Sequence, residues 1–221
     1  MTRVFIILCG LCLILLGGYF AFSRWAIRHD TLALFDVSRG RVVSLDISVL
    51  RDSERRAAAG LVKLPVAIIS QGNTVKNTEY AFLANVLAAR GYLVVSIQHD
   101  LPTDAPLVTN PGALYAGRLP EYQRAEKTIF YAIGELRKIQ PNADYNHLTM
   151  VGHSNGGDIS MFFAQEHPDR VRMVVTLDNL RVPCLTSGTV KILSFRSKDW
   201  KPDRGVVPSK AQSIKSGIKI I

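Results

Sequence analysis

From residue 65 onward, short apolar runs alternate with longer segments of helical periodicity. The short runs are rich in β-branched residues, which predicts buried strands over 65–70, 93–98, 147–152, 173–177 and 191–195. Apolar residues at helical spacing predict helices over 77–90, 121–139 and 155–166, the first of which ends before Gly91. Strands that are apolar on both faces are typical of parallel sheets covered by helices. We therefore predict an α/β fold with a mostly parallel, doubly wound sheet.

The segment before residue 65 has weaker patterns. Residues 41–49 alternate between apolar and polar positions, which predicts a half-buried strand. Residues 51–60 carry five charges and indicate an exposed turn, while residues 24–41 are polar and irregular, as expected of a linker. We therefore expect a single domain over residues 42–221.

The N-terminal segment is the longest apolar run of the chain. Residues 4–22 contain no charge and as a helix would span about 28 Å, close to the thickness of the bilayer core. Arg3 precedes this run and Arg24 follows it, so the flanking charge does not fix an orientation. The run predicts a signal anchor over residues 1–23, with a cleaved signal peptide as the alternative. We expect a membrane-anchored or exported protein, with the periplasmic or extracellular side favoured.

Composition and charge exclude several other classes of protein. The chain has 221 residues, enough for one domain with a core, and a formal net charge of +9. Residues 181–221 contain nine Lys or Arg and two Asp, but these charges are scattered and have no interleaved aromatic residues, so we expect no nucleic-acid partner. The three cysteines, Cys9, Cys12 and Cys184, have no zinc-ligand spacing, and we expect no metal or cofactor.

Residues 100–119 interrupt the alternation of strands and helices. This segment contains three prolines and two glycines and lacks periodicity. Because it follows the carboxyl end of a predicted strand, where open α/β sheets bind ligands, we interpret it as part of a substrate entrance. A surface loop without a function is the alternative.

The sequence Gly152-His153-Ser154-Asn155-Gly156 matches the nucleophile motif G-x-S-x-G. The motif follows a predicted strand and begins a predicted helix, as a nucleophile elbow requires. Ser154 is therefore the candidate nucleophile, and the backbone N–H of Asn155 at the helix N-terminus is a candidate oxyanion donor. In the loop after the strand 65–70, Gly72 permits a tight turn, and the N–H of Asn73 is the candidate second donor.

Four blocks in this order resemble the α/β-hydrolases, in particular the platelet-activating-factor acetylhydrolase and dienelactone-hydrolase-like esterases. They are PVAIISQGNTVKNTEYAFLANVLAARGY, LVVSIQHD, MVGHSNGGDIS and VVTLDNLRVP, within residues 65–183. The resemblance implies cofactor-free hydrolysis of a small-molecule or lipid ester, with short-acyl and lipid esters both open. It implies supporting roles for His99 and for Gln71, which stands where these families usually have histidine before Gly72. The elbow residue His153 is expected to pack beside the turn.

The identity of the acid remains open between two residues. In acetylhydrolase-like members the acid ends the strand that corresponds to 173–177, which favours Asp178. Across the wider fold the acid more often follows the next strand, which indicates Asp199 as the alternative. Each also has a simpler interpretation, Asp178 as a turn residue and Asp199 as a surface charge.

The general base is missing from the sequence. In this fold the triad histidine follows the acid, but none of the five histidines follows Asp178 or Asp199. Residues 216–221 resemble the start of a further strand, so we expect a C-terminally truncated chain that lacks the triad histidine, the end of this strand and a last helix. A serine without a base is a poor nucleophile at pH 7. Three functions remain open: an impaired serine esterase, a non-catalytic pseudo-hydrolase that binds an acyl ligand or a protein partner, and a non-catalytic domain in which the match to the elbow motif is accidental.

Overall fold

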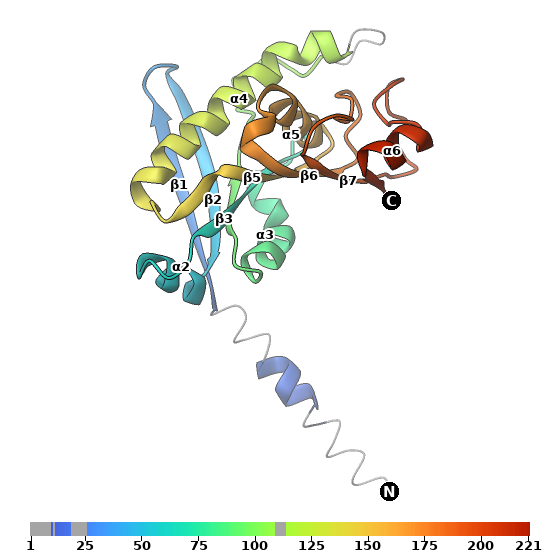
Figure 1. Ribbon diagram of the computed structural model, residues 1–221. Helices are drawn as coiled ribbons and strands as arrows, with labels where there is room; N and C mark the ends of the chain where they lie inside the picture. Colours follow the sequence, from blue (N-terminus) through green and yellow to red (C-terminus); the bar gives the residue numbers. More distant parts are fainter. Residues whose placement is uncertain (1–9, 11, 19–25, 109–113) are drawn as a thin grey trace, which may run out of the picture.

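The computed structural model describes residues 10, 12–18, 26–108 and 114–221, and it contains an eight-stranded sheet with helices on both faces (Figure 1). In chain order its strands are β1 (Ile27–Asp36), β2 (Arg41–Leu50), β3 (Leu64–Ser70), β4 (Leu93–Ile97), β5 (Ala143–His153), β6 (Val171–Leu177), β7 (Lys191–Phe195) and β8 (Lys219–Ile220). The order across the sheet is β1-β2-β4-β3-β5-β6-β7-β8. Strands β3 to β8 pair in parallel, whereas β1 and β2 form an antiparallel hairpin at one edge. The predicted α/β class is confirmed, as a mixed sheet.

The helices are α2 (Arg51–Ala58), α3 (Ala81–Ala88), α4 (Leu114–Ile139), α5 (Asn155–Glu166) and α6 (Lys210–Ser216), with short 3₁₀ turns η1 (Asn77–Tyr80) and η2 (Pro168–Arg170). Alternate residues of the central strands pack on opposite faces of the sheet. In β3, Ile68 belongs to the core that α4 and α5 cover, while Ile69 packs with Ala84 of α3. This double coverage explains why the central strands are apolar at nearly every position.

Two predictions for the first third of the domain are wrong. From Ile27 on, the expected linker is strand β1, so the domain begins before residue 42. β1 is an edge strand, and several of its residues face solvent, so its apolar pattern is weak. The expected exposed turn over 51–60 is largely helix α2, which buries only Ala57 and therefore shows little apolar periodicity.

Further boundaries differ from the prediction in the second half of the chain. Helix α4 begins at Leu114, seven residues before the expected start, because Pro120 lies inside it rather than before it. The sequence analysis missed α6, which buries no residue and begins with a capping box formed by Ser209 and Gln212. The strand expected at 216–221 is the short β8.

The predicted apolar segment 4–22 lies mostly outside the described residues. The part that is described, residues 12–18, is helical and exposed. Within the described ranges, no helix has the length and apolar character needed to cross a bilayer.

Candidate active site

The serine of the G-x-S-x-G motif occupies the sharp turn between β5 and α5. Ser154 has φ 51° and ψ −118°, a backbone conformation that residues other than glycine rarely adopt. Its N–H donates to the carbonyl of Leu177 in β6 (2.8 Å), and its carbonyl accepts from the N–H of Asp158 in α5 (3.1 Å). The turn is thus held by bonds to the neighbouring strand and to the helix. This is the strand–turn–helix geometry of a nucleophile elbow.

The two glycines of the motif lie where no side chain fits. A Cβ on Gly152 would lie 2.0 Å from the carbonyl oxygen of Gly156. A Cβ on Gly156 would lie 2.1 Å from the carbonyl oxygen of Ser70, at the end of β3. The second contact places the loop after β3 directly against the elbow, where a second oxyanion donor is needed.

Tyr80 links this loop to the elbow. Its hydroxyl accepts from the N–H of Gly72 (2.9 Å) and shares a hydrogen bond with Nδ1 of His153 (2.8 Å). The N–H of Gly72 is therefore occupied, which leaves the next N–H, that of Asn73, as the candidate donor in this loop. Tyr80 was missed in the sequence analysis, in which it was only one apolar position of a helix.

Gln71 ties the same loop to the end of β4. With its amide oriented to satisfy its neighbours, it donates to the carbonyl of Ile97 (2.6 Å) and accepts from the N–H of His99 (3.0 Å). Gln71 is 1% exposed, so these bonds are shielded from water. This glutamine thus anchors the loop to the end of β4 by hydrogen bonds.

Asp178 ends β6 beside the elbow and also has a positive φ, 61°. Its carboxylate accepts from the hydroxyl of Ser197 (2.7 Å) and pairs with the guanidinium of Arg196 (3.2 Å). Asp199 is exposed in the loop after β7, and its N–H donates to the hydroxyl of Ser197 (3.2 Å). Of the two candidate acids, Asp178 is therefore the buried one, and its ionic partner is an arginine.

The five histidines all have hydrogen-bond partners away from the candidate nucleophile and acid. The partners are Ser48 for His29, Ser70 for His99, Asp144 for His147, Tyr80 for His153 and Glu126 for His167. Across the part of the chain that the structure describes, no histidine hydrogen-bonds to Ser154 or Asp178.

His99 lies just after the carboxyl end of β4, and it is enclosed. Its Nε2 lies 3.0 Å from the hydroxyl of Ser70, and its Nδ1 is buried with no hydrogen-bond partner. Burial, together with the positive charges of Arg124 and Arg41, lowers the pKa of His99 to about 3. The imidazole is therefore neutral at physiological pH and acts as a structural link between β3 and β4.

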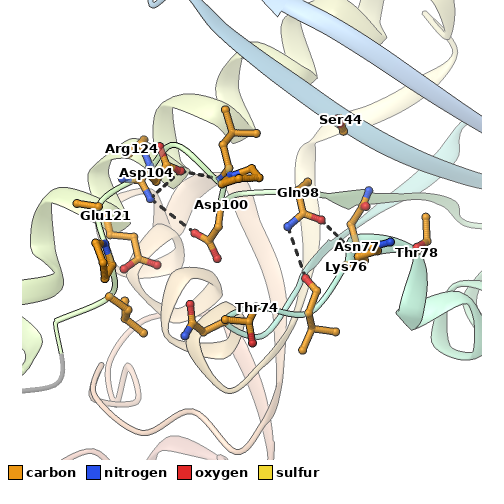
Figure 2. Close-up of a pocket in the computed structure, with 17 residues that line it drawn as sticks. Ser44, Thr74, Lys76, Asn77, Thr78, Gln98, Asp100, Asp104, Glu121 and Arg124 are labelled. Carbon is orange, nitrogen blue, oxygen red and sulfur yellow. Dashed lines mark hydrogen bonds and ion pairs between the residues drawn. The ribbon is translucent and has the colours of Figure 1, made fainter.

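A cavity of about 850 Å³ lies at the carboxyl ends of β3 and β4 (Figure 2). Its wall includes Asn73 of the loop after β3, Glu121 of α4 and the segment 100–107. The predicted entrance segment thus contributes directly to the cavity. Val75, Leu101, Pro102, Ala105, Pro106 and Leu107 supply the apolar part of the wall.

Charged side chains, which the sequence analysis did not select, line one side of the cavity. Asp104 accepts from Arg41 (2.6 Å) and pairs with Arg124 (3.4 Å), which also lies 3.6 Å from Asp100. Burial raises the pKa of Asp100. Burial likewise raises the pKa of Glu121, which the charge of Asp100 raises further. The signal for Asp100 in the sequence was its place directly after a buried strand.

Two carboxylates support the elbow helix, the half-buried Glu121 in the cavity wall and the buried Asp158 of α5. Glu121 accepts a hydrogen bond from the side chain of Asn155 (2.5 Å), so α4 holds the first residue of α5. Oδ1 of Asp158 accepts from the N–H groups of Leu180, Arg181 and Val182 and fixes the loop that follows Asp178. Burial raises the pKa of Asp158 to about 6.

The described residues include no group of three or more His, Cys, Asp or Glu side chains placed to hold a metal ion. The side chains gathered at the elbow are instead hydroxyl, amide, guanidinium and carboxylate groups.

Comparisons with known proteins agree with the strand–turn–helix geometry around Ser154. Residues 111–200, which contain α4, β5, the elbow and the end of β7, match the family model described as alpha/beta hydrolase fold. The chain has the α/β-hydrolase fold. No curated protein sequence matches it.

Solved structures with this fold resemble the α/β-hydrolase-fold chain at low sequence identity. A dienelactone hydrolase-like promiscuous phosphotriesterase, P91, from metagenomic libraries is 11% identical with a TM-score of 0.57, over 89% of this chain and 80% of that one. An S-formylglutathione hydrolase from Staphylococcus aureus is 16% identical with a TM-score of 0.51, over 67% of this chain and 56% of that one. An esterase from Rhizomucor miehei is 16% identical with a TM-score of 0.50, over 68% and 44%. The chain thus spans about half the length of the last two.

Proposed function

We propose that this α/β-hydrolase-fold chain is a serine hydrolase of carboxylic esters. The observation that carries the proposal is the elbow, where Ser154 has a strained backbone between two glycines that no larger residue can replace. The loop with Asn73 lies against this turn, and the cavity of about 850 Å³ includes Asn73 in its wall. The fold of esterases and of a dienelactone hydrolase-like enzyme is consistent with this function.

In the proposed reaction, the hydroxyl of Ser154 attacks the ester carbonyl and transfers its proton to a water molecule, and water in turn supplies the proton that the departing alkoxide takes up. The N–H groups of Asn155 and Asn73 donate to the oxyanion that forms on the carbonyl oxygen. Collapse of this intermediate breaks the ester bond, releases the alcohol and leaves an acyl group on Ser154. Water then hydrolyses the acyl-enzyme and restores the serine.

Asp178 is the proposed acid of this site, and Asp199 is the alternative. We favour Asp178 because it is buried at the end of β6, whose last residue, Leu177, accepts from the N–H of Ser154. We further propose that turnover by these 221 residues is slow, since all five histidines have other partners and the serine hydroxyl lacks a base. Oxyanion stabilisation and binding alone leave only a small part of the catalysis of a full triad.

A labelling experiment tests the nucleophile. A fluorophosphonate bearing a fluorophore is expected to label the wild-type chain slowly, and the Ser154→Ala variant should remain unlabelled. Ser160→Ala is a matched control because Ser160 is a fully buried serine of the same helix, and it should label as the wild type does. Equal labelling of wild type and Ser154→Ala would remove Ser154 from the mechanism.

The arrangement around Asp178 favours one further candidate, a pseudo-hydrolase that binds an acyl ligand or a protein partner without turnover. The bonds from Arg196 and Ser197 occupy the carboxylate that a triad histidine would need. This candidate predicts that a non-hydrolysable ester analogue binds in calorimetry while p-nitrophenyl acetate is not hydrolysed at all. Hydrolysis that Ser154→Ala abolishes would exclude it.

We also propose that residues 4–22 attach the chain to a membrane, as a signal anchor, with the domain on the periplasmic or extracellular side. The proposal rests on the length and composition of that apolar run. A cleaved signal peptide would instead yield a shorter, exported chain, and intact-mass analysis of the mature protein separates the two.

A further inference from the structure

The polypeptide enters the sheet at the end opposite the elbow. β1 is antiparallel to β2, and β2 is antiparallel to β4, so β1 runs in the same direction as the parallel strands. Its first residue, Ile27, therefore lies at the amino ends of these strands, whereas the elbow and the cavity lie at their carboxyl ends. Figure 1 shows α2 and α3 at the same end of the molecule as the start of β1.

The length of β1 sets the separation of the two ends. The far end of the hairpin is fixed at the cavity, because Arg41 donates both to Asp104 and to the carbonyl of His99 (each 2.6 Å). Asp36 pairs with Arg41 in the register, and Ile27 lies nine residues earlier in the same strand. At 3.3–3.4 Å per residue, Ile27 is about 30 Å from the cavity end of the sheet.

The apolar run 4–22 ends only four residues before Ala26. Four residues reach at most about 14 Å when fully extended. If the run is held in a bilayer, as proposed above, the amino end of the sheet must stay close to the lipid surface. The opposite end, with Ser154 and the cavity, can then lie up to about 30 Å farther from the lipid, and the surface charge decides whether it does.

The surface charge fits this orientation. Exposed basic residues precede or begin several strands at the amino end of the sheet, and two more lie on α2: Arg55, Arg56, Lys63, Arg90, Lys191 and Lys219. Among the carboxylates at this end, Asp52 pairs with Arg55 (3.5 Å) and offsets its charge, Asp144 pairs with His147 (2.9 Å), and Asp169 before β6 is exposed. A basic face next to an apolar segment is attracted to anionic lipid headgroups.

We propose that the amino end of the sheet rests on the anionic bilayer that holds residues 4–22, and that the cavity therefore takes a water-soluble ester rather than a lipid of that bilayer. The inference rests on the proposed esterase function and on the proposed membrane attachment. It decides between the two ester classes that the sequence leaves open.

A quenching experiment on the full chain tests the orientation without requiring activity. In a Cys9→Ser, Cys12→Ser background, a fluorophore is attached to Leu61→Cys, next to α2, or to Ala105→Cys, at the cavity. In vesicles of phosphatidylcholine and phosphatidylglycerol with nitroxide-labelled headgroups, the label at position 61 should be strongly quenched and the label at position 105 should not. Equal quenching at both positions, or a chain that does not float with the vesicles, would overturn the proposal.

A second experiment tests the substrate class. In vesicles, a water-soluble fluorophosphonate should label Ser154 at least tenfold faster than a fluorophosphonate on a short spacer from a phospholipid headgroup. In detergent solution the two probes should label at similar rates. Inserting 25 flexible Gly/Ser residues after Trp25 adds an r.m.s. length of about 28 Å and should restore labelling by the lipid probe in vesicles.

The two failures are distinguishable. Equal labelling by both probes in vesicles contradicts the inference and leaves the esterase proposal standing. Absence of Ser154 labelling in detergent contradicts the proposed function itself and with it the ester assignment, while the quenching experiment still decides the orientation.

Discussion

At the scale of single residues, the site depends on two glycines whose lack of a side chain leaves room for neighbouring backbone atoms. Ser154 can take its strained turn because Gly152 and Gly156 allow the backbone of α5 and of the loop after β3 to approach. These glycines are needed for close contact between backbones and not for an unusual φ, since neither has a positive φ. The motif in the sequence predicts this crowding, and the structure supplies the atoms involved.

Gly152→Ala should therefore disrupt the domain, because the new methyl group meets backbone atoms that have no room to move. We expect a loss of about 3 kcal/mol or more in the free energy of unfolding, measured by urea denaturation. Gly134→Ala is the matched control, since Gly134 lies in α4 with nothing within 4 Å of the new Cβ. This control should gain about 0.5–1 kcal/mol. Equal stability of Gly152→Ala and wild type would contradict the elbow geometry.

At the scale of elements, the chain forms its predicted strands and helices wherever burial is deep. β3, β4 and α5 were predictable because both faces of the strands and nearly all of the helix are buried. The sequence analysis missed β1, α2 and α6 because each buries two residues or fewer and therefore has little apolar periodicity. Hairpin pairing stabilises β1, and a capping box stabilises the start of α6.

The residues of the candidate site also differ in how far the sequence predicts them. Ser154 and Gly72 were recognisable because local chain geometry fixes their roles. Tyr80, Glu121 and Arg41 were not, because each acts through a partner more than thirty residues away or in another element. The histidines could be counted in the sequence, but their partners became known only from tertiary packing.

His99, which links β4 to β3 through the hydroxyl of Ser70, makes this link sensitive to pH. The pKa of His99 falls from an ordinary 6.5 in the unfolded chain to about 3 in the folded one. The folded state therefore binds fewer protons than the unfolded state between these values, and stability falls as the pH drops below 6.5. At pH 5 this linkage costs about 2 kcal/mol relative to pH 8.

His99→Gln removes this titration and keeps a group that can hydrogen-bond to Ser70. We expect the loss of thermal stability between pH 7 and pH 5 to be smaller in His99→Gln than in wild type, as measured by Tm. Gln123→Asn provides the control, because Gln123 is exposed and carries no titratable group, so this substitution should leave the acid sensitivity of the domain unchanged. Parallel Tm curves for wild type and His99→Gln would show that His99 is not the group responsible.

At the scale of the whole molecule, the two ends of the sheet differ in chemistry. The carboxyl end combines the elbow with a cavity lined by three carboxylates, an arginine and a lysine, whereas the amino end carries several exposed basic residues. Because the two ends differ in this way, the proposed orientation places the end with the elbow in water and the basic end against an anionic surface. The two lateral edges of the sheet differ as well, since β1 of the β1–β2 hairpin forms one and the two-residue β8 forms the other.

The β8 edge is one place where the described part of the molecule is open to self-association. Ile214 of α6 and Ile221 after β8 are 74% and 68% exposed and line a groove of about 750 Å³. The backbone of an edge strand is also free to pair with another chain. Ile214→Lys with Ile221→Lys should therefore delay the onset of association to at least severalfold higher protein concentration, measured by sedimentation velocity in a non-denaturing detergent. Leu61→Lys changes an equally exposed residue, at 72%, near α2, and it should have little effect. If this control suppresses association as strongly as the edge variant, then general surface charge and not the β8 edge governs association.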